Sequence, residues 1–198
     1  MAELAAAAAA RPDDQPLQYH VTDPQYWLAL AAGRNADAYA AADVLMGLDQ
    51  LGPEQAVPQA IRAAVWERDL ALAEQARDRF PPPSPQKRQL LLLCRAGEAG
   101  ILALSGRPEA AAAYREVLRE LRDAGLRFPH ALATIDALLL LGRDDPEIRS
   151  SAGEAREFLT RVGARPFLER LDALSAAPER AEILSASAGG ARLAPSAG

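Results

Sequence analysis

The stretch that decides the fold is GRPEAAAAYREVLRELRDAGLRFPHALATIDALLLLGRDDPE, residues 106–147. Apolar side chains recur along it at steps of three and four residues, which is the spacing of one face of an α-helix. Glycine closes such runs at Gly106 and Gly142, and proline-glutamate opens a helix soon after each of them, at Pro108 and Pro146. A further glycine separates the two apolar runs. The stretch therefore predicts two amphipathic helices joined by a turn.

This pattern repeats at the length of a helical hairpin. Gly106 and Gly142 are 36 residues apart, which is close to the unit of about 34 residues in tetratricopeptide arrays. The same order of glycine, turn and proline-glutamate begins at Gly52. A single amphipathic hairpin cannot bury its own apolar face, so such hairpins stack. We therefore expect an all-α protein, a tetratricopeptide-like α-solenoid of stacked antiparallel helical hairpins.

Composition favours helices and narrows the classes of function. Hydrophobic residues, many of them alanine, make up 49% of the 198 residues, and aromatic residues only 5%, which favours helix over sheet. The net charge is -5 with acids and bases interspersed, so we expect no nucleic-acid partner. A single cysteine cannot form an internal disulfide. Because the chain therefore needs no oxidising compartment, we expect a cytoplasmic protein. No apolar run is long enough to span a membrane, so we expect no membrane partner.

Prolines and glycines divide the rest of the chain. Thr22-Asp23-Pro24 supplies a capping side chain followed by proline, and predicts a helix from there to about Gly33. Four of the five residues 81–85 are proline, which predicts an extended linker. We expect five segments: a disordered alanine-rich leader (1–21), N-terminal helical hairpins (22–80), the proline linker (81–85), tetratricopeptide-like hairpins with a capping helix (86–175) and a disordered tail (176–198).

The region from Gly106 to Leu174 resembles a known family. Its most specific parts are GRPEAAAAYREVL (106–118), LLGRDDPE (140–147) and AREFLTRVGARPFLERL (155–171). They resemble the C-terminal tetratricopeptide-like helical region of bacterial multidomain signal-transduction ATPases, which also carry an adenylate or guanylate cyclase domain or a LuxR-type DNA-binding domain. The resemblance implies a role in sensing or assembly, with an ATPase or cyclase module as one possible partner. The chain has no phosphate-binding GxxxxGK[ST] loop and no recognisable cyclase segment, so no catalytic residue is carried over.

No pattern in the sequence predicts a catalytic residue, a cofactor site or a metal site. Cys94 lies on the apolar stripe of its predicted helix, where a cysteine behaves as a small hydrophobe. His20 and His130 are the two histidines, and neither has metal-ligand spacing or an adjacent nucleophile. The acidic pairs are interpreted as a solvated helix face and a helix start: Glu154 with Glu157, and Asp144 with Asp145.

Five residues are candidates for an interaction surface. Trp27, Tyr39 and Trp66 are amphipathic aromatic residues of the kind that anchor interfaces. The alternative for these three is that they fill the first hairpins. Arg161 and Arg165 flank a glycine break and would suit an anion or an acidic partner. The alternative for the two arginines is a solvated position at a helix end.

The stacked hairpins, the resemblance and these residues together suggest two functions. The first is a non-catalytic protein-interaction or regulatory arm of a signal-transduction ATPase or cyclase-type regulator, with a protein or peptide in the groove of the stack. The second is a small-molecule-sensing domain, with a pocket among Trp27, Tyr39 and Trp66 that gates an attached output domain. An independent enzyme is disfavoured because no nucleophile, base and orienting group come together.

Overall fold

The computed structural model describes residues 2–48 and 53–176, and all regular structure in these ranges is helical. The predicted all-α class is therefore confirmed. In this part of the chain a short 3-10 helix, η2 (Pro53–Ala56), accompanies ten α-helices: α1 (Ala2–Ala9), α2 (Gln15–Ala31), α3 (Asn35–Met46), α4 (Val57–Glu67), α5 (Leu70–Asp78), α6 (Arg88–Leu104), α7 (Ala110–Asp123), α8 (Arg127–Leu141), α9 (Pro146–Val162) and α10 (Arg165–Ala176).

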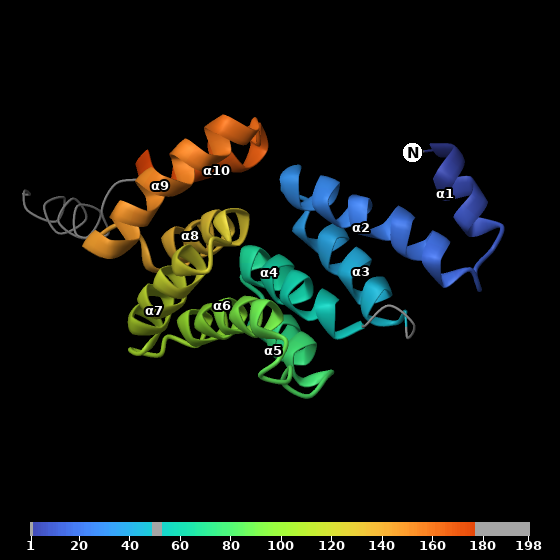
Figure 1. Cartoon of the computed structure of the whole chain (residues 1–198), viewed down its shortest axis with the longest axis horizontal. Helices are drawn as coiled ribbons and strands as arrows, with labels where there is room; N and C mark the ends of the chain where they lie inside the picture. The colour runs from blue at the N-terminus through green and yellow to red at the C-terminus, as the bar shows by residue number, and fades with distance from the viewer. Residues whose placement is uncertain (1, 49–52, 177–198) are drawn as a thin grey trace, which may run out of the picture.

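Consecutive helices pack against one another in pairs, α2 with α3, α4 with α5, α6 with α7 and α8 with α9 (Figure 1). Helix α6 also packs against the first helices of the neighbouring pairs, α4 and α8, and α8 packs against α10. The α2–α3 pair joins the next pair through its second helix, because α3 packs against α4. In addition, α4 contacts α8 directly. Helices α4, α6 and α8 therefore form the middle of the molecule, with the remaining helices around them.

Two glycines of α6 allow α4 and α6 to approach closely. A Cβ atom on Gly97 would lie 2.9 Å from Cγ2 of Ile61, and one on Gly100 would lie 2.8 Å from Cγ2 of Val65. Ile61 and Val65 are one turn apart on α4, and both are buried. The two glycines therefore form a flat strip on α6 into which a ridge of β-branched side chains from α4 fits.

The left-handed conformation of glycine ends several of these helices. Gly163 has φ +70° at the end of α9, and Gly106 has φ +67° after α6. Such angles cost glycine little because it has no Cβ atom. At Gly163 the next amide, that of Ala164, donates a hydrogen bond of 3.0 Å to the Leu159 carbonyl oxygen, which closes the last turn of α9 and lets the chain reverse into α10.

The beginning of the chain differs from the sequence-based expectation of a disordered leader over 1–21. Residues Ala2–Ala9 form α1, and α2 begins at Gln15 rather than after Thr22. Asp14 caps α2, because its Oδ1 accepts a hydrogen bond of 3.1 Å from the Leu17 amide. Pro24 lies inside α2, so it interrupts one helical hydrogen bond instead of opening the helix.

Two expectations concern residues that the structure does not describe. The predicted disordered tail over 176–198 lies outside the described residues except for Ala176, which ends α10. Gly52, where the repeated turn pattern begins, also lies outside them. Among the helices that the structure does describe, none combines the length and the apolar character needed to cross a membrane.

Candidate functional site

A buried ion pair joins α4 to α8 at the centre of the molecule. Nε of Arg62 donates to Oδ2 of Asp136 at 3.2 Å, and Nε1 of Trp66 donates to Oδ1 at 2.5 Å. The side chains of Arg62 and Asp136 are only 6% and 4% exposed. Burial raises the pKa of Asp136 above its ordinary value, while the charge of Arg62 and the two hydrogen bonds oppose that rise. We call Arg62, Trp66 and Asp136 the central cluster.

Aromatic rings continue the central cluster towards both ends of the chain. The ring centroid of Trp66 lies 6.2 Å from that of Phe167 on α10, and Phe167 lies 5.7 Å from Phe128 on α8. Phe128 is in turn 5.6 Å from Trp27 on α2. The guanidinium of Arg170 covers the Trp66 ring at 4.0 Å, a cation–π contact. The rings therefore connect the first pair of helices to the last helix.

The five residues proposed as an interaction surface are distributed over three places. Trp66 is buried and Trp27 is half-buried, and both pack in the aromatic centre just described. Tyr39 lies apart from them, with its hydroxyl 3.5 Å from the Leu72 carbonyl oxygen of α5. Arg161 and Arg165 are both exposed at the turn between α9 and α10.

Sequence reasoning missed the two charged residues of the central cluster. Asp136 is the one acid in the predominantly apolar stretch HALATIDALLLL (130–141), and Arg62 is the one charge in VPQAIRAAVW (57–66). A lone charge in a buried helix requires a partner, because burying an unpaired charge is very costly. From these two lone charges of opposite sign, the contact between α4 and α8 could have been predicted.

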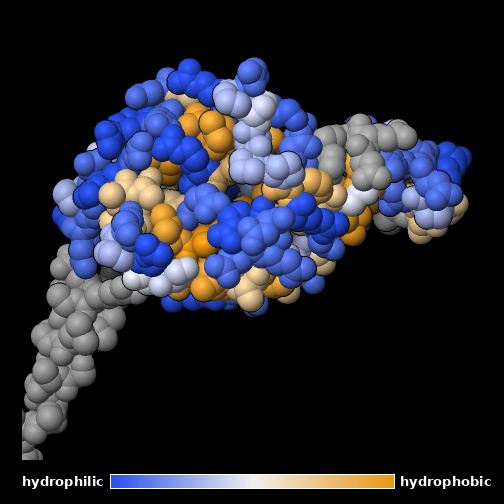
Figure 2. Space-filling model, turned by 90° about the horizontal axis from the view of Figure 1, so that it is seen from below, coloured by the Kyte–Doolittle hydropathy of each residue, from blue (hydrophilic) through white to orange (hydrophobic). Residues whose placement is uncertain are grey.

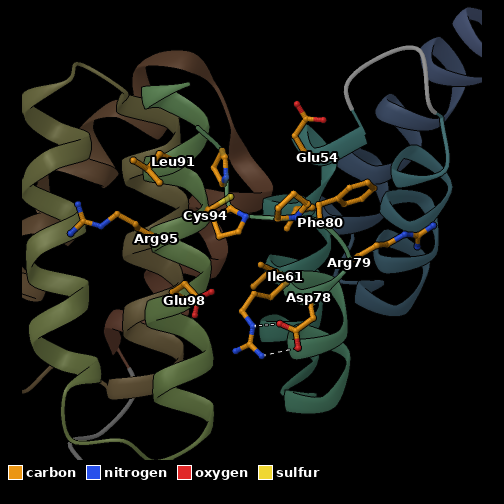
Figure 3. Close-up of a pocket in the computed structure, with 14 residues that line it drawn as sticks. Glu54, Ile61, Asp78, Arg79, Phe80, Leu91, Cys94, Arg95 and Glu98 are labelled. Carbon is orange, nitrogen blue, oxygen red and sulfur yellow. Dashed lines mark hydrogen bonds and ion pairs between the residues drawn. The ribbon is translucent and has the colours of Figure 1, made fainter. Parts of the chain in front are cut away.

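An apolar groove of about 540 Å³ lies between α4, α5, the proline segment and α6. Figure 2 views the molecule from the side on which α5 and α6 lie, and shows apolar surface in a hollow bordered by hydrophilic side chains. Ile61 of α4 lines the groove, with Leu91 and Cys94 of α6 opposite it (Figure 3). Val57 of α4 also lines it. Its other lining residues are Glu54, Arg77, Asp78, Arg79, Phe80, Pro81, Pro82, Pro83, Arg95 and Glu98. We call it the Cys94 groove.

The groove exists because α5 and α6 are held apart. Residues 81–84 have no regular secondary structure and carry the chain away from the end of α5 before a turn at 85–86. On α6, the Gly97 strip touches α4, whereas Cys94, one turn earlier, faces the groove (Figure 3). Helices α4 and α6 are therefore closely packed at Gly97, and the groove opens beside them at Cys94.

Most charged groups on the rim of the groove have a partner. Arg77 pairs with Asp78 at 2.7 Å, and Arg95 pairs with Glu120 at 2.5 Å and with a second acid of α7. Other ion pairs join Arg79 to Asp43 and Lys87 to Glu54. Glu98 is different, because no hydrogen bond or ion pair joins its carboxylate to the part of the chain that the structure describes.

Burial affects the ionisable groups of two α6 residues that line the groove, Glu98 and Cys94. It raises the pKa of the Glu98 carboxyl above its ordinary value. Burial and, to a smaller extent, the charge of Glu98 raise the pKa of the Cys94 thiol to about 11. The thiol is therefore protonated at neutral pH and has little nucleophilic character. Cys94 is half-buried, so it contributes to the apolar surface of the groove more than to the closed core.

Comparisons with protein-family models, with curated proteins and with solved structures find no match to this chain. The assignment of a function therefore depends on the geometry of its own residues.

The other ionisable residues considered from the sequence have structural surroundings. Glu154 pairs with Arg122 at 3.0 Å. Asp145 caps α9 by accepting hydrogen bonds from two amides of its first turn, the shorter being 2.9 Å. His130 is buried, and burial lowers its pKa. Among the described residues no three His, Cys, Asp or Glu side chains are placed to hold a metal ion. The Cys94 groove is thus the arrangement best suited to binding.

Proposed function

We propose that this chain is a non-catalytic interaction module, a tetratricopeptide-like arm that docks a peptide segment of a protein partner in the Cys94 groove. The observation that carries the proposal is the groove itself, in which partly exposed apolar side chains of α6 face buried apolar side chains of α4, beside one carboxylate, Glu98, that lacks a partner among the described residues. Its volume of about 540 Å³ suits one or two large side chains of a bound segment.

The packing of the helices supports a repeat architecture. Successive pairs stack through their first helices, α4 on α6 and α6 on α8, and α10 covers α8 and α9 as a last helix. Stacked hairpins expose long surfaces that bind extended or helical peptides. Together with the resemblance of residues 106–174, this arrangement supports a regulatory arm of a cytoplasmic signal-transduction ATPase or cyclase-type regulator.

The carboxylate of Glu98 indicates which residues the bound peptide should contain. The other rim charges are already paired, so a ligand with an apolar side chain and one basic residue would complete the groove by placing its charge beside Glu98. A partly buried carboxylate interacts more strongly with such a cation than an exposed one does. We therefore propose a partner segment with a large aliphatic or aromatic anchor next to a lysine or arginine.

A random peptide library displayed on phage tests this proposal. Selection on the wild-type chain is expected to enrich peptides with an apolar anchor and an adjacent basic residue. Leu91→Glu, which places a charge in the groove, is expected to abolish binding of the selected peptides. Val44→Glu is the matched control, because Val44 is 49% exposed on α3, outside the groove. Glu98→Gln is expected to retain the anchor preference and lose the preference for the basic residue.

Two results would contradict the proposal. One is the absence of any enriched motif on the wild-type chain. The other is binding that survives Leu91→Glu as well as it survives Val44→Glu.

The alternative is a small-molecule-sensing domain that gates an attached output domain. The volume of the Cys94 groove favours it, because pockets for small molecules span about 300–1,000 Å³. In that case the site is the groove and not a space among Trp27, Tyr39 and Trp66, since Tyr39 lies apart from the two tryptophans. A thermal-shift screen of small molecules, repeated with Leu91→Glu, separates this alternative from peptide docking.

A further inference from the structure

A second hollow, of about 350 Å³, lies between the end of α8, α9 and the end of α10, which are drawn at upper left in Figure 1, away from α5. Arg143, Arg149 and Arg156 line it. Its other described lining residues are Leu138, Ala152, Gly153 and Ser175, and none of the described residues that line it is acidic. We call it the arginine hollow.

Helix α9 forms one wall of the arginine hollow with a single face. Arg149, Ala152, Gly153 and Arg156 are spaced by three, one and three residues, so they follow one another along the same side of the helix. The two arginines are seven residues apart, which corresponds to about 10.5 Å along the axis. A Cβ atom on Gly153 would meet nothing within 4 Å. The face is thus a shallow trough of small residues with a guanidinium at each end.

Main-chain contacts hold two of the arginines at the edge of the hollow. Arg149 donates from Nε to the Arg143 carbonyl oxygen at 3.2 Å and from Nη2 to the Asp144 carbonyl oxygen at 3.3 Å. Nη1 of Arg143 donates to the Ser175 carbonyl oxygen at 3.2 Å. Carbonyl oxygens carry no formal charge, so these contacts orient the Arg149 guanidinium without neutralising it.

Arg156 has an acidic partner that an incoming anion can replace. Its Nη2 lies 2.7 Å from Oδ1 of Asp172, and the two side chains are 53% and 49% exposed. A surface ion pair of this kind contributes little free energy. Arg156 can therefore turn from Asp172 towards a ligand in the hollow at a small cost.

We propose that the arginine hollow binds a small molecule that carries a diphosphate group. Guanidinium groups match phosphate oxygens with paired N–H donors. Two arginines separated by two helical turns suit an elongated anion with two phosphoryl groups better than a single compact one. The volume of the hollow lies within the range of small-molecule sites and is too small for a folded partner element.

Inorganic pyrophosphate is the probe, with sodium chloride added to keep the ionic strength constant. We expect it to raise the Tm of the wild-type chain by about 3 °C or more at saturating concentration. The double substitution Arg149→Gln with Arg156→Gln is expected to abolish that rise. Arg161→Gln is the matched control, because Arg161 is an exposed arginine of α9 outside the hollow. Inorganic phosphate, run in parallel, is expected to have a smaller effect than pyrophosphate.

The urea midpoint of the double variant without ligand shows whether it folds normally. We expect an unchanged midpoint, because both substituted arginines are exposed. No rise in the Tm of the wild-type chain would overturn the proposal. So would an equal rise in the double variant, because pyrophosphate would then bind elsewhere. An equal effect of phosphate and pyrophosphate would overturn the assignment of a diphosphate.

Discussion

The central cluster and the Cys94 groove use the same helix, α4, in opposite ways. Near its C-terminal end, Arg62 and Trp66 bind Asp136 of α8, and the Phe167 ring and the Arg170 guanidinium of α10 pack on Trp66. Near its N-terminal end, Val57 and Ile61 border an open groove. The difference arises because Gly97 and Gly100 let α6 pack closely on α4, whereas residues 81–83 of the proline segment line the open groove. A structural contact and a binding surface can therefore occupy neighbouring turns of one helix.

The largest expected effect on stability comes from breaking the ion pair of the central cluster. Asp136→Ala leaves Arg62 buried and without its counter-ion, and removes the acceptor of the Trp66 indole, so we expect a loss of about 3–5 kcal/mol in the free energy of unfolding. Urea denaturation measures it. Asp172→Ala is the control, because its ion pair is half-exposed, and it should cost less than about 1 kcal/mol. Similar costs for the two variants would contradict a structural role for the cluster.

The next largest effect on stability concerns the strip formed by Gly97 and Gly100 of α6. Gly100→Ala would place a Cβ atom 2.8 Å from Val65 and 3.1 Å from the Tyr114 hydroxyl, and overpacking of this kind costs about 1–3 kcal/mol. Gly153→Ala is the matched helical control, because its Cβ atom would meet nothing within 4 Å. It should stabilise the protein by up to about 1 kcal/mol. Thermal unfolding of both variants measures the contrast, and equal signs would contradict the close packing of α4 and α6.

The groove itself can be probed through the pH dependence of Cys94 labelling. Because the pKa of the thiol is raised from 9.0 to about 11, its thiolate fraction at pH 8 is far below that of an ordinary cysteine. We expect alkylation by iodoacetamide at pH 8 to be at least about tenfold slower in the folded chain than in urea. The rate should keep rising with pH up to about 11. Equal rates in the folded and unfolded chains would contradict the assigned surroundings of Cys94.

The smallest effect compares two fully buried tyrosines near the central cluster. The Tyr26 hydroxyl donates to the Gln59 carbonyl oxygen at 3.1 Å, so Tyr26→Phe should cost about 1 kcal/mol. The Tyr114 hydroxyl is buried without a hydrogen-bond partner among the described residues. Tyr114→Phe should therefore leave the free energy of unfolding unchanged or raise it by about 0.5 kcal/mol. Chemical denaturation distinguishes them, and a larger loss for Tyr114→Phe would contradict this packing.

Local signals in the sequence predicted the helices better than they predicted the site. Gly106, Gly142 and Gly163 all have positive φ angles at the ends of helices, and the low cost of such angles for glycine is a local property that is visible in the sequence itself. The start of α2 was misplaced because two capping signals compete there, and the cap at Asp14 prevails over the one at Thr22-Asp23-Pro24.

The groove and the central cluster depend on contacts between residues that are distant in the chain. Arg62 and Asp136 are 74 residues apart, and nothing in the local pattern around either residue specifies the other. The groove likewise requires α4, α5 and α6 to be placed in space, although its cause, the prolines at 81–83, was visible. The sequence placed Cys94 on an apolar face of its helix. Whether that face packs against another helix or lines a groove depends on the positions of α4 and α5.

The central claim is that the Cys94 groove docks a peptide with an apolar anchor and a basic residue. The most direct measurement is an NMR titration of the isotope-labelled chain with a selected peptide. The account predicts that the largest chemical-shift changes fall on Leu91, Cys94, Glu98 and Ile61, and that the indole signals of Trp27 and Trp66 change little. Changes centred on the tryptophans or on Arg161 and Arg165, with the groove signals unaffected, would contradict it.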